Sequence, residues 1–332
     1  MKIIILAGGK GTRLWPMSRS NFPKQFLTIN GKTLLRKTIE RCLLLEKPEN
    51  ILISINKAYL NLTQKELKGT KIPLKNIISE PFSKNTGPAI FFALSKLNKD
   101  ELIFVCPSDH YISPEKDFAK TILKAQKIAS LKNIVTFGIK PTSPETGYGY
   151  IEMKESLLKR EKGIKYYQVK SFIEKPELKK AKQLLSLKRY YWNSGMFLFP
   201  LEIMKQEFKK AGFTSANLRG MQSISIDKAV IEKSDKVVAI PTSFSWNDIG
   251  SWDAFYQIQE KNKEGNVVVG NALVLDTKNS LVVGSKRLVT CFGLNDVAII
   301  ETEDAVFIGP MSRSQEVKLL VQNLEKKNKN IL

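Results

Sequence analysis

The chain is poor in the residues that build histidine and thiol sites. It has one histidine, His110, and three widely spaced cysteines, Cys42, Cys106 and Cys291. A metal site made of several histidines is therefore excluded, and a Ser-His-Asp triad would have to use His110. Few, scattered cysteines argue against a disulfide framework and predict a reducing, cytoplasmic setting. Any metal should be a hard cation held by carboxylates and phosphates, which indicates Mg²⁺.

Long apolar runs are also missing, and the residues before Gly8 are too few for a signal-peptide core. We therefore expect no membrane partner. The net charge is +21, but the lysines are spread along the chain and not interleaved with aromatic residues in one patch. This distribution favours a solvated basic surface over a nucleic-acid interface, so no nucleic-acid partner is expected. A positive field would still attract a triphosphate.

The first 27 residues contain the clearest candidate for a ligand-binding motif. The apolar run at 3–7 predicts a buried parallel strand, and Gly8, Gly9 and Gly11 follow it. Backbone N–H groups in such a turn can bind phosphate oxygens, and Arg13 and Lys24 add positive charge. The string is neither a P-loop nor a complete dinucleotide fingerprint. A plain strand-to-helix turn is the alternative to a nucleoside triphosphate loop.

Strands and helices are expected to alternate through the first half of the chain, which predicts an α/β fold with a parallel sheet. Ligands bind beyond the carboxyl ends of such strands. Asp109 follows the expected strand at 102–106 and could hold Mg²⁺ there, the alternative being a helix cap. Asp248, in an aromatic loop that contains Gly250, could be a second ligand.

Polar residues in the middle of the chain suit a sugar phosphate. Tyr148 lies between two glycines, so the backbone there can approach a ligand closely. Glu174 and Lys175 end an expected strand, where one can accept hydrogen bonds from sugar hydroxyls and the other can meet a phosphate. Asn193 offers an amide to hydroxyl groups.

After residue 265 the sequence changes to short alternating strands, followed by an amphipathic helix at 311–327. We therefore expect two domains, at 1–264 and 265–332. The β-rich tail is a candidate surface for forming a homodimer.

Taken together, these strings resemble sugar-1-phosphate nucleotidyltransferases and, within them, the bacterial mannose-1-phosphate guanylyltransferases. The resemblance covers nearly all of residues 1–325. It rests on Leu6-Ala7-Gly8-Gly9-Lys10-Gly11-Thr12-Arg13-Leu14-Trp15-Pro16, Pro23-Lys24-Gln25-Phe26, Glu80-Pro81 with Asn85-Thr86, Pro107-Ser108-Asp109-His110, Gly147-Tyr148-Gly149-Tyr150-Ile151, Phe172-Ile173-Glu174-Lys175-Pro176, Trp192-Asn193-Ser194-Gly195-Met196-Phe197 and Trp246-Asn247-Asp248-Ile249-Gly250.

The resemblance implies a Rossmann-like domain with a mostly parallel sheet, a small β-helix-like domain closed by a helix, and Mg²⁺-assisted transfer of GMP from GTP to mannose 1-phosphate. Arg13, Lys24 and Lys175 would be catalytic, with Arg13 on the β- and γ-phosphates, Lys24 near the α-phosphate and Lys175 on the sugar phosphate. Asp109 and Asp248 would hold the metal. Implied nucleotide contacts are Ala7, Gly8, Gly9, Gly11, Thr12, Glu80, Asn85, Thr86, Pro107 and Ser108, and implied sugar contacts are Tyr148, Gly149, Glu174 and Asn193.

Two departures from the family matter. Lys84 stands where the family usually has arginine, which puts a bidentate contact in doubt. Many relatives also carry a cupin domain with isomerase activity. One histidine could not furnish the metal site of such a domain, so we expect no isomerase activity.

Two alternatives stay open: another member of the superfamily with a different base or hexose, and a non-catalytic sugar-nucleotide sensor. The retention of Arg13, Lys24, Asp109 and Asp248 together speaks against the sensor.

Overall fold

The computed structural model describes residues 1–9, 11–98, 100–161, 163–215 and 217–327, so Lys10 of the glycine-rich string lies outside the described residues. The chain divides into two compact units, each discontinuous in sequence. The first contains Met1–Gly8, Arg36–Ser108 and Ile112–Trp246, and the second contains Gly9–Leu35, Asp109–Tyr111 and the chain from Asn247 onward. Among the described residues, no helix combines the length and the apolar character that crossing a bilayer requires.

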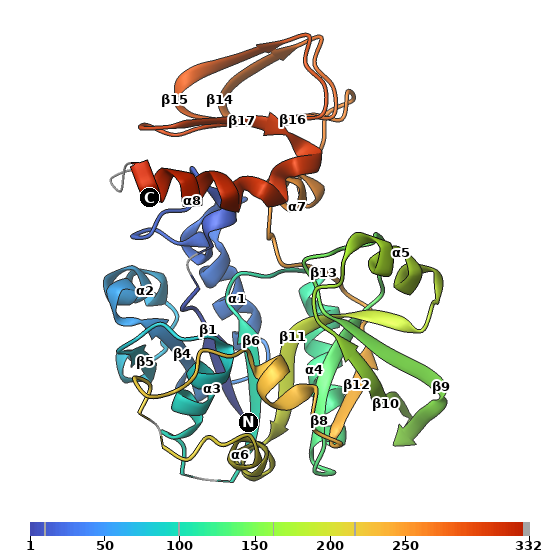
Figure 1. The fold of residues 1–332 in the computed structure, drawn as a ribbon. Helices are drawn as coiled ribbons and strands as arrows, with labels where there is room; N and C mark the ends of the chain where they lie inside the picture. Colours follow the sequence, from blue (N-terminus) through green and yellow to red (C-terminus); the bar gives the residue numbers. More distant parts are fainter. Residues whose placement is uncertain (10, 99, 162, 216, 328–332) are drawn as a thin grey trace. The chain divides into compact units, whose positions relative to one another are not determined.

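The first unit is built on a nine-stranded sheet with the order β5-β4-β1-β6-β11-β8-β12-β10-β9 (Figure 1). Its strands are β1 (Lys2–Leu6), β4 (Ile51–Asn56), β5 (Ile77–Glu80), β6 (Leu102–Pro107), β8 (Ile134–Ile139), β9 (Tyr150–Glu161), β10 (Ile164–Ile173), β11 (Tyr190–Pro200) and β12 (Val237–Pro241). Of these described strands, β10 and β11 run against the others. The predicted mostly parallel sheet is therefore confirmed.

Both faces of this sheet are buried, which explains the continuous apolar runs of its central strands. On one face, Ile4 and Val105 belong to a buried cluster with residues of α3 (Thr86–Leu94), α6 (Leu201–Lys210) and the π-helix η6 (Asp227–Ile231). On the other, Phe104 packs against Phe118 of α4 (Glu115–Ala129), with ring centroids 6.1 Å apart. The remaining helices labelled in this part of the chain are α1 (Leu34–Leu43), α2 (Leu60–Leu67) and α5 (Leu178–Ser186).

The second unit contains a four-stranded sheet with the order β14-β15-β16-β17. Its strands are β14 (Val267–Leu275), β15 (Leu281–Phe292), β16 (Val297–Glu301) and β17 (Val306–Pro310). Consecutive strands β14, β15 and β16 pair in parallel after short connections, as in the coils of a β-helix, and β17 returns antiparallel. The terminal helix α8 (Val317–Lys327) lies against this part of the unit, as the sequence predicts (Figure 1).

The N-terminal segment of the second unit shares one core with its C-terminal strands. Trp15 and Leu27 belong to the same buried cluster as Trp252, Val267 and Val317. The indole N–H of Trp252, in α7 (Trp252–Gln257), donates to the carbonyl of Trp15 at 3.1 Å. Four short strands remain among those that the structure describes. β2 (Thr28–Ile29) pairs with β3 (Lys32–Thr33), and β7 (Tyr111–Ser113) and β13 (Ser245–Asn247) lie where the chain passes between units.

Candidate active site

The glycine-rich turn is shaped by the residue that it packs against. Gly11 has φ of 63°, and a Cβ added to it would overlap Cβ of Lys24. Only glycine therefore fits there without moving Lys24. A Cβ added to Gly9 would meet no described atom within 4 Å, so this side of the turn has room for a ligand. The Gly11 carbonyl accepts a hydrogen bond from Ser18 Oγ at 2.7 Å, which fixes the turn.

In the second unit, Lys24 contacts both of the aspartates that were proposed to hold a metal ion. Its side chain is almost buried, its Nζ donates to the carbonyl of Asp248, and it forms an ion pair with Asp109 Oδ2 at 2.7 Å. A buried ammonium needs such partners, because leaving it unpaired would be strongly unfavourable. The structure thus brings together Lys24, Asp109 and Asp248, which the sequence proposed separately.

Asp109 stays ionised in these surroundings. Burial is the largest single effect and acts to raise the pKa of its carboxyl group, but the charges of Lys24 and His110 together with hydrogen bonds from Lys24 and the backbone hold this pKa below its ordinary value. The side chain of Asp109 is 31% exposed, so one edge remains accessible to a cation. The helix-cap alternative does not apply, because Pro114 stands at the N-cap of α4, the helix that follows.

The Asp248 loop is held by short local hydrogen bonds. Asp248 Oδ1 accepts from the backbone N–H of Gly250 at 2.8 Å, and Asn247 Oδ1 accepts from that of Ile249 at 2.6 Å. Ser251 then caps α7 by accepting from the N–H of Ala254. The described residues contain no group of three or more acidic, histidine or cysteine side chains arranged for a metal ion. Two carboxylates still suit Mg²⁺, which takes most of its other ligands from water and substrate phosphates.

Arg13 has a partner that the sequence pattern did not indicate. Its Nη1 donates to Gln315 Oε1 at 2.9 Å. Gln315 lies in the short helix η7 (Met311–Glu316), 302 positions along the chain. The guanidinium is therefore held by a segment close to the C-terminus. Thr12, the residue before Arg13, is exposed.

In the first unit, the residues proposed for the nucleotide lie at the carboxyl ends of parallel strands. Glu80 ends β5, is buried and accepts from Ser54 Oγ at 2.7 Å. Burial raises the pKa of Glu80, and the Ser54 hydrogen bond acts in the opposite direction. A Cβ added to Gly8 would lie 3.7 Å from Glu80 Oε1. Ala7 donates its N–H to the Ser54 carbonyl at 2.7 Å, so this edge of the sheet is tightly ordered.

Asn85, Thr86, Pro107 and Ser108 already have structural contacts. Asn85 caps α3 by accepting from the N–H of Thr86 at 2.8 Å. Thr86 Oγ1 accepts from the N–H of Ile226 at 2.9 Å. Pro107 ends β6, and the next residue, Ser108, donates its N–H to the carbonyl of Leu6 at 2.9 Å. Their roles at the nucleotide stay predictions.

The residues proposed for the sugar gather in the first unit around Gly149. A Cβ added to Gly149 would lie 2.8 Å from the Phe172 ring and 2.9 Å from Glu174 Oε2, so a side chain has no room there. The Gly149 carbonyl accepts from the N–H of Asn193 at 2.8 Å. Glu174 pairs with Lys175 at 3.0 Å, and the N–H of Lys175 donates to the carbonyl of Tyr148.

Asn193 is oriented by two side chains that the sequence did not single out. Its Oδ1 accepts from Thr136 Oγ1 at 3.0 Å, and its Nδ2 donates to Asp227 Oδ1 at 2.8 Å. Burial and the nearby charge of Glu174 raise the pKa of Asp227 to about 6. The sequence offered no signal for this role, because Asp227 stands outside the strings on which the family resemblance rests. Asn193 also lies within β11, at a bulge.

The fold and these residues define a nucleotidyltransferase. A family model described as "Nucleotidyl transferase" matches residues 2–265, and a second, described as "MannoseP isomerase/GMP-like beta-helix domain", matches residues 270–324. The chain belongs to the nucleotidyl transferase family.

Relatives cover nearly the whole chain. Alginate biosynthesis protein AlgA of Pseudomonas putida is 36% identical, over 98% of this chain and 72% of that protein. Mannose-1-phosphate guanylyltransferase of Salmonella montevideo is 37% identical, over 98% of this chain and 74% of that protein. A solved structure from Thermus thermophilus, described as a mannose-1-phosphate geranyltransferase, has a TM-score of 0.86 at 29% identity and covers 98% of this chain and 99% of its own.

Proposed function

We propose that this chain transfers GMP from GTP to α-D-mannose 1-phosphate and so produces GDP-mannose and pyrophosphate. The observation that carries the proposal is the grouping of Lys24, Asp109 and Asp248 beside the tight turn at Gly11. This grouping supplies fixed positive charge from Lys24 and the carboxylate of Asp109 next to the backbone of Asp248, and phosphoryl transfer uses such charges. The substrates are inferred from the name of the Salmonella relative.

The reaction needs positioning and charge neutralisation more than proton transfer. The phosphate of mannose 1-phosphate is already an anion, so it can attack the α-phosphorus of GTP without a general base. Pyrophosphate leaves in line with the attack. Lys24 would neutralise charge near the α-phosphate and Arg13 would bind the β- and γ-phosphates. Both cations are held by hydrogen bonds to other residues, which limits their motion during the reaction.

Asp109 and Asp248 would hold Mg²⁺. When bound, the cation would supply positive charge against the phosphates of the substrate. The lowered pKa of Asp109 supports this assignment, because an ionised carboxylate is the form that binds a hard cation. The ion pair with Lys24 also orients the Asp109 carboxylate.

The first unit would supply the substrate contacts. Glu80 would accept from the N1–H and 2-amino groups of guanine, and Lys175 would meet the sugar phosphate. Hexose hydroxyls would bind Glu174, Asn193 and the backbone at Gly149, beside Tyr148. Further proposed nucleotide contacts are Ala7, Gly8, Asn85, Thr86, Pro107 and Ser108 of this unit, and Gly9, Gly11 and Thr12 of the second unit. The proposal is supported by the proximity of these residues, because Glu174 packs against Gly149 and the N–H of Asn193 donates to the Gly149 carbonyl.

A single assay tests the reaction and its alternatives. Pyrophosphate release is measured for each nucleoside triphosphate with each hexose 1-phosphate, with and without Mg²⁺. We expect fastest release with GTP, mannose 1-phosphate and Mg²⁺. Faster release with another pair would assign a different sugar nucleotide, and no release with any pair would indicate a binding protein.

Three further features are proposed with this function. Residues 1–264 would form the catalytic domain and 265–332 an accessory domain, a division supported by the two matched ranges. A cytoplasmic location is supported by three free cysteines, of which Cys42 and Cys106 lie 3.8 Å apart without a disulfide. A homodimer would form through the β-rich part of the second unit, where apolar side chains such as Phe292 and Ile308 are exposed.

A further inference from the structure

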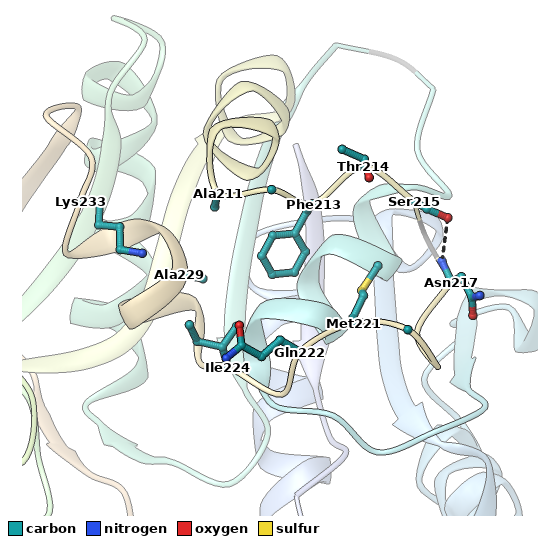
Figure 2. A pocket seen from close by; sticks show the side chains of 12 residues that line it. Ala211, Phe213, Thr214, Ser215, Asn217, Met221, Gln222, Ile224, Ala229 and Lys233 are labelled. Carbon is teal, nitrogen blue, oxygen red and sulfur yellow. Dashed lines mark hydrogen bonds between the residues drawn. The ribbon is translucent and has the colours of Figure 1, made fainter.

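A cavity of about 410 Å³ lies in the first unit, and none of the described residues that line it belongs to the proposed substrate contacts. It is formed by the loop after α6 together with residues in and around η6 (Figure 2). The residues that line it are Ala211, Gly212, Phe213, Thr214, Ser215, Asn217, Gly220, Met221, Gln222, Ile224, Ala229 and Lys233. Sites for small organic molecules typically have volumes of roughly 300–1,000 Å³, so this one is large enough for a ligand.

One wall of the cavity is apolar and well supported. The Phe213 ring points into the cavity between Ile224 and Met221 (Figure 2). It is fixed from behind by two aromatic neighbours, Phe208 at 5.0 Å and Phe91 at 5.4 Å between ring centroids. A ring held in this way offers a preformed surface on which a flat or ring-shaped ligand can pack. The thioether of Met221 adds an adaptable apolar contact.

The rest of the lining is polar and carries positive charge. Thr214, Ser215, Asn217 and Gln222 contribute hydroxyl or amide groups, and Lys233 is the single charged residue among the described residues that line the cavity. No carboxylate belongs to this described lining. One ammonium with several neutral donors matches a ligand that carries one anionic group and a ring with polar edges.

We propose that this cavity is a second ligand site, which takes a ring-bearing phosphomonoester and influences substrate binding. The phosphate would meet Lys233 and the hydroxyl donors, and the ring would pack on Phe213. Nucleoside monophosphates and hexose phosphates share this chemistry. The influence on substrate binding rests on the function proposed above, whereas the binding site itself does not.

The connection runs through the segment 224–229, which forms part of the cavity wall. The carbonyl of Ile224 accepts from the N–H of Gly87 at 3.1 Å, and a Cβ added to Gly87 would lie 2.8 Å from that oxygen. Ile226 donates its N–H to Thr86 Oγ1, and Asp227 accepts from Asn193. A ligand that repositions this segment therefore moves the partners of Thr86, a proposed nucleotide contact, and of Asn193, a proposed sugar contact.

Calorimetric titration of the whole chain tests the site. Adenosine 5′-monophosphate and glucose 6-phosphate are the two probes, because neither is a substrate of the proposed reaction. We expect at least one to bind, with affinity reduced about tenfold in Lys233→Gln, since the contact to a charged group is lost. Lys209→Gln, which removes an exposed lysine outside the lining, should leave the affinity unchanged. Absence of binding, or equal binding by both variants, would overturn the site.

Steady-state kinetics test the influence on substrate binding. A saturating amount of the bound probe should change KM for GTP or mannose 1-phosphate at least about twofold in the parent and in Lys209→Gln, but not in Lys233→Gln. Unchanged KM despite Lys233-dependent binding would overturn the coupling. If no substrate pair releases pyrophosphate, the proposed function fails, while the titration result still decides whether the cavity binds its ligand.

Discussion

At the scale of single residues, the chemistry depends on how charges are kept in poorly hydrated surroundings. Lys24 is only 6% exposed, and its ammonium lies between the Asp109 carboxylate and the Asp248 carbonyl. This pairing stabilises the buried ammonium of Lys24 and keeps the pKa of Asp109 low. The same arrangement explains Gly11, because any side chain there would push Lys24 away from its partners.

Asp109→Asn should lower kcat about 100-fold or more, because an electrostatic contact to the reacting phosphates or their metal is lost. The Lys24 ammonium is buried but keeps the Asp248 carbonyl as an acceptor, so loss of the ion pair should lower the free energy of unfolding by about 1–3 kcal/mol. Pyrophosphate release and urea unfolding measure the two effects. Asp100→Asn, at an exposed position, is the control. Turnover within about threefold of the parent would remove Asp109 from the metal site.

Asp227 should make stability fall as pH rises through its titration range. Its pKa in the folded chain is raised to about 6 by burial, so between about pH 4 and pH 6 the folded state binds more protons than the unfolded state. The protonated form is therefore favoured by folding, and about 1–3 kcal/mol is lost across this window. Asp227→Asn should remove that part of the pH dependence, as measured by urea unfolding at several pH values. Exposed Asp235→Asn should retain it, and an unchanged profile in Asp227→Asn would contradict the assignment.

At the scale of elements, the π-helix η6 and the residues before it connect parts of the first unit. Within a few positions this segment contacts the start of α3 through Thr86 and Gly87, and β11 through Asn193. A π-helix is a rare geometry that is often found at functional sites. It also allows Asp227 to contribute its side chain to Asn193 while Ala229 and Val230 stay buried against the sheet.

Thr86→Val should lower the free energy of unfolding by about 1–3 kcal/mol, because the N–H of Ile226 loses its acceptor without access to a new one. Thr86→Ser keeps the hydroxyl and should stay within about 0.5 kcal/mol of the parent, since it loses only a methyl group at a half-buried position. Urea unfolding of the three proteins makes the comparison. Equal stability of the valine and serine variants would show that this hydrogen bond does not secure the segment.

At the scale of the whole molecule, the glycine-rich segment and the C-terminal strands belong to one compact unit. Trp15 and Leu27 share a buried cluster with Val267 and Val317, and Arg13 is hydrogen-bonded to Gln315. The loop proposed to bind triphosphate is therefore supported by residues from the other end of the chain. We infer that the β-rich region contributes to the geometry of Arg13 as well as to stability.

The proposed homodimer is tested by light scattering after size-exclusion chromatography. Phe292 and Ile308 are 72% and 67% exposed, so replacing both with glutamate should leave each monomer folded. Charges within an apolar interface are unfavourable, and the double variant should therefore be monomeric when the parent is dimeric. Leu44→Glu and Leu123→Glu, at exposed positions of the first unit, should not change the mass. A monomeric parent, or a double variant that remains dimeric, would exclude this surface.

The sequence by itself predicted most strands of the first sheet and the small β-rich region, and it proposed the site residues. This was possible because strands buried on both faces are continuous apolar runs, and because glycine, lysine and aspartate stand at their ends. Only the tertiary structure decided which of these residues meet. Lys24 reaches the Asp248 carbonyl across 224 positions, and Asn193 reaches Thr136 and Asp227 across 57 and 34. Such contacts depend on how elements pack, and no local periodicity encodes that packing.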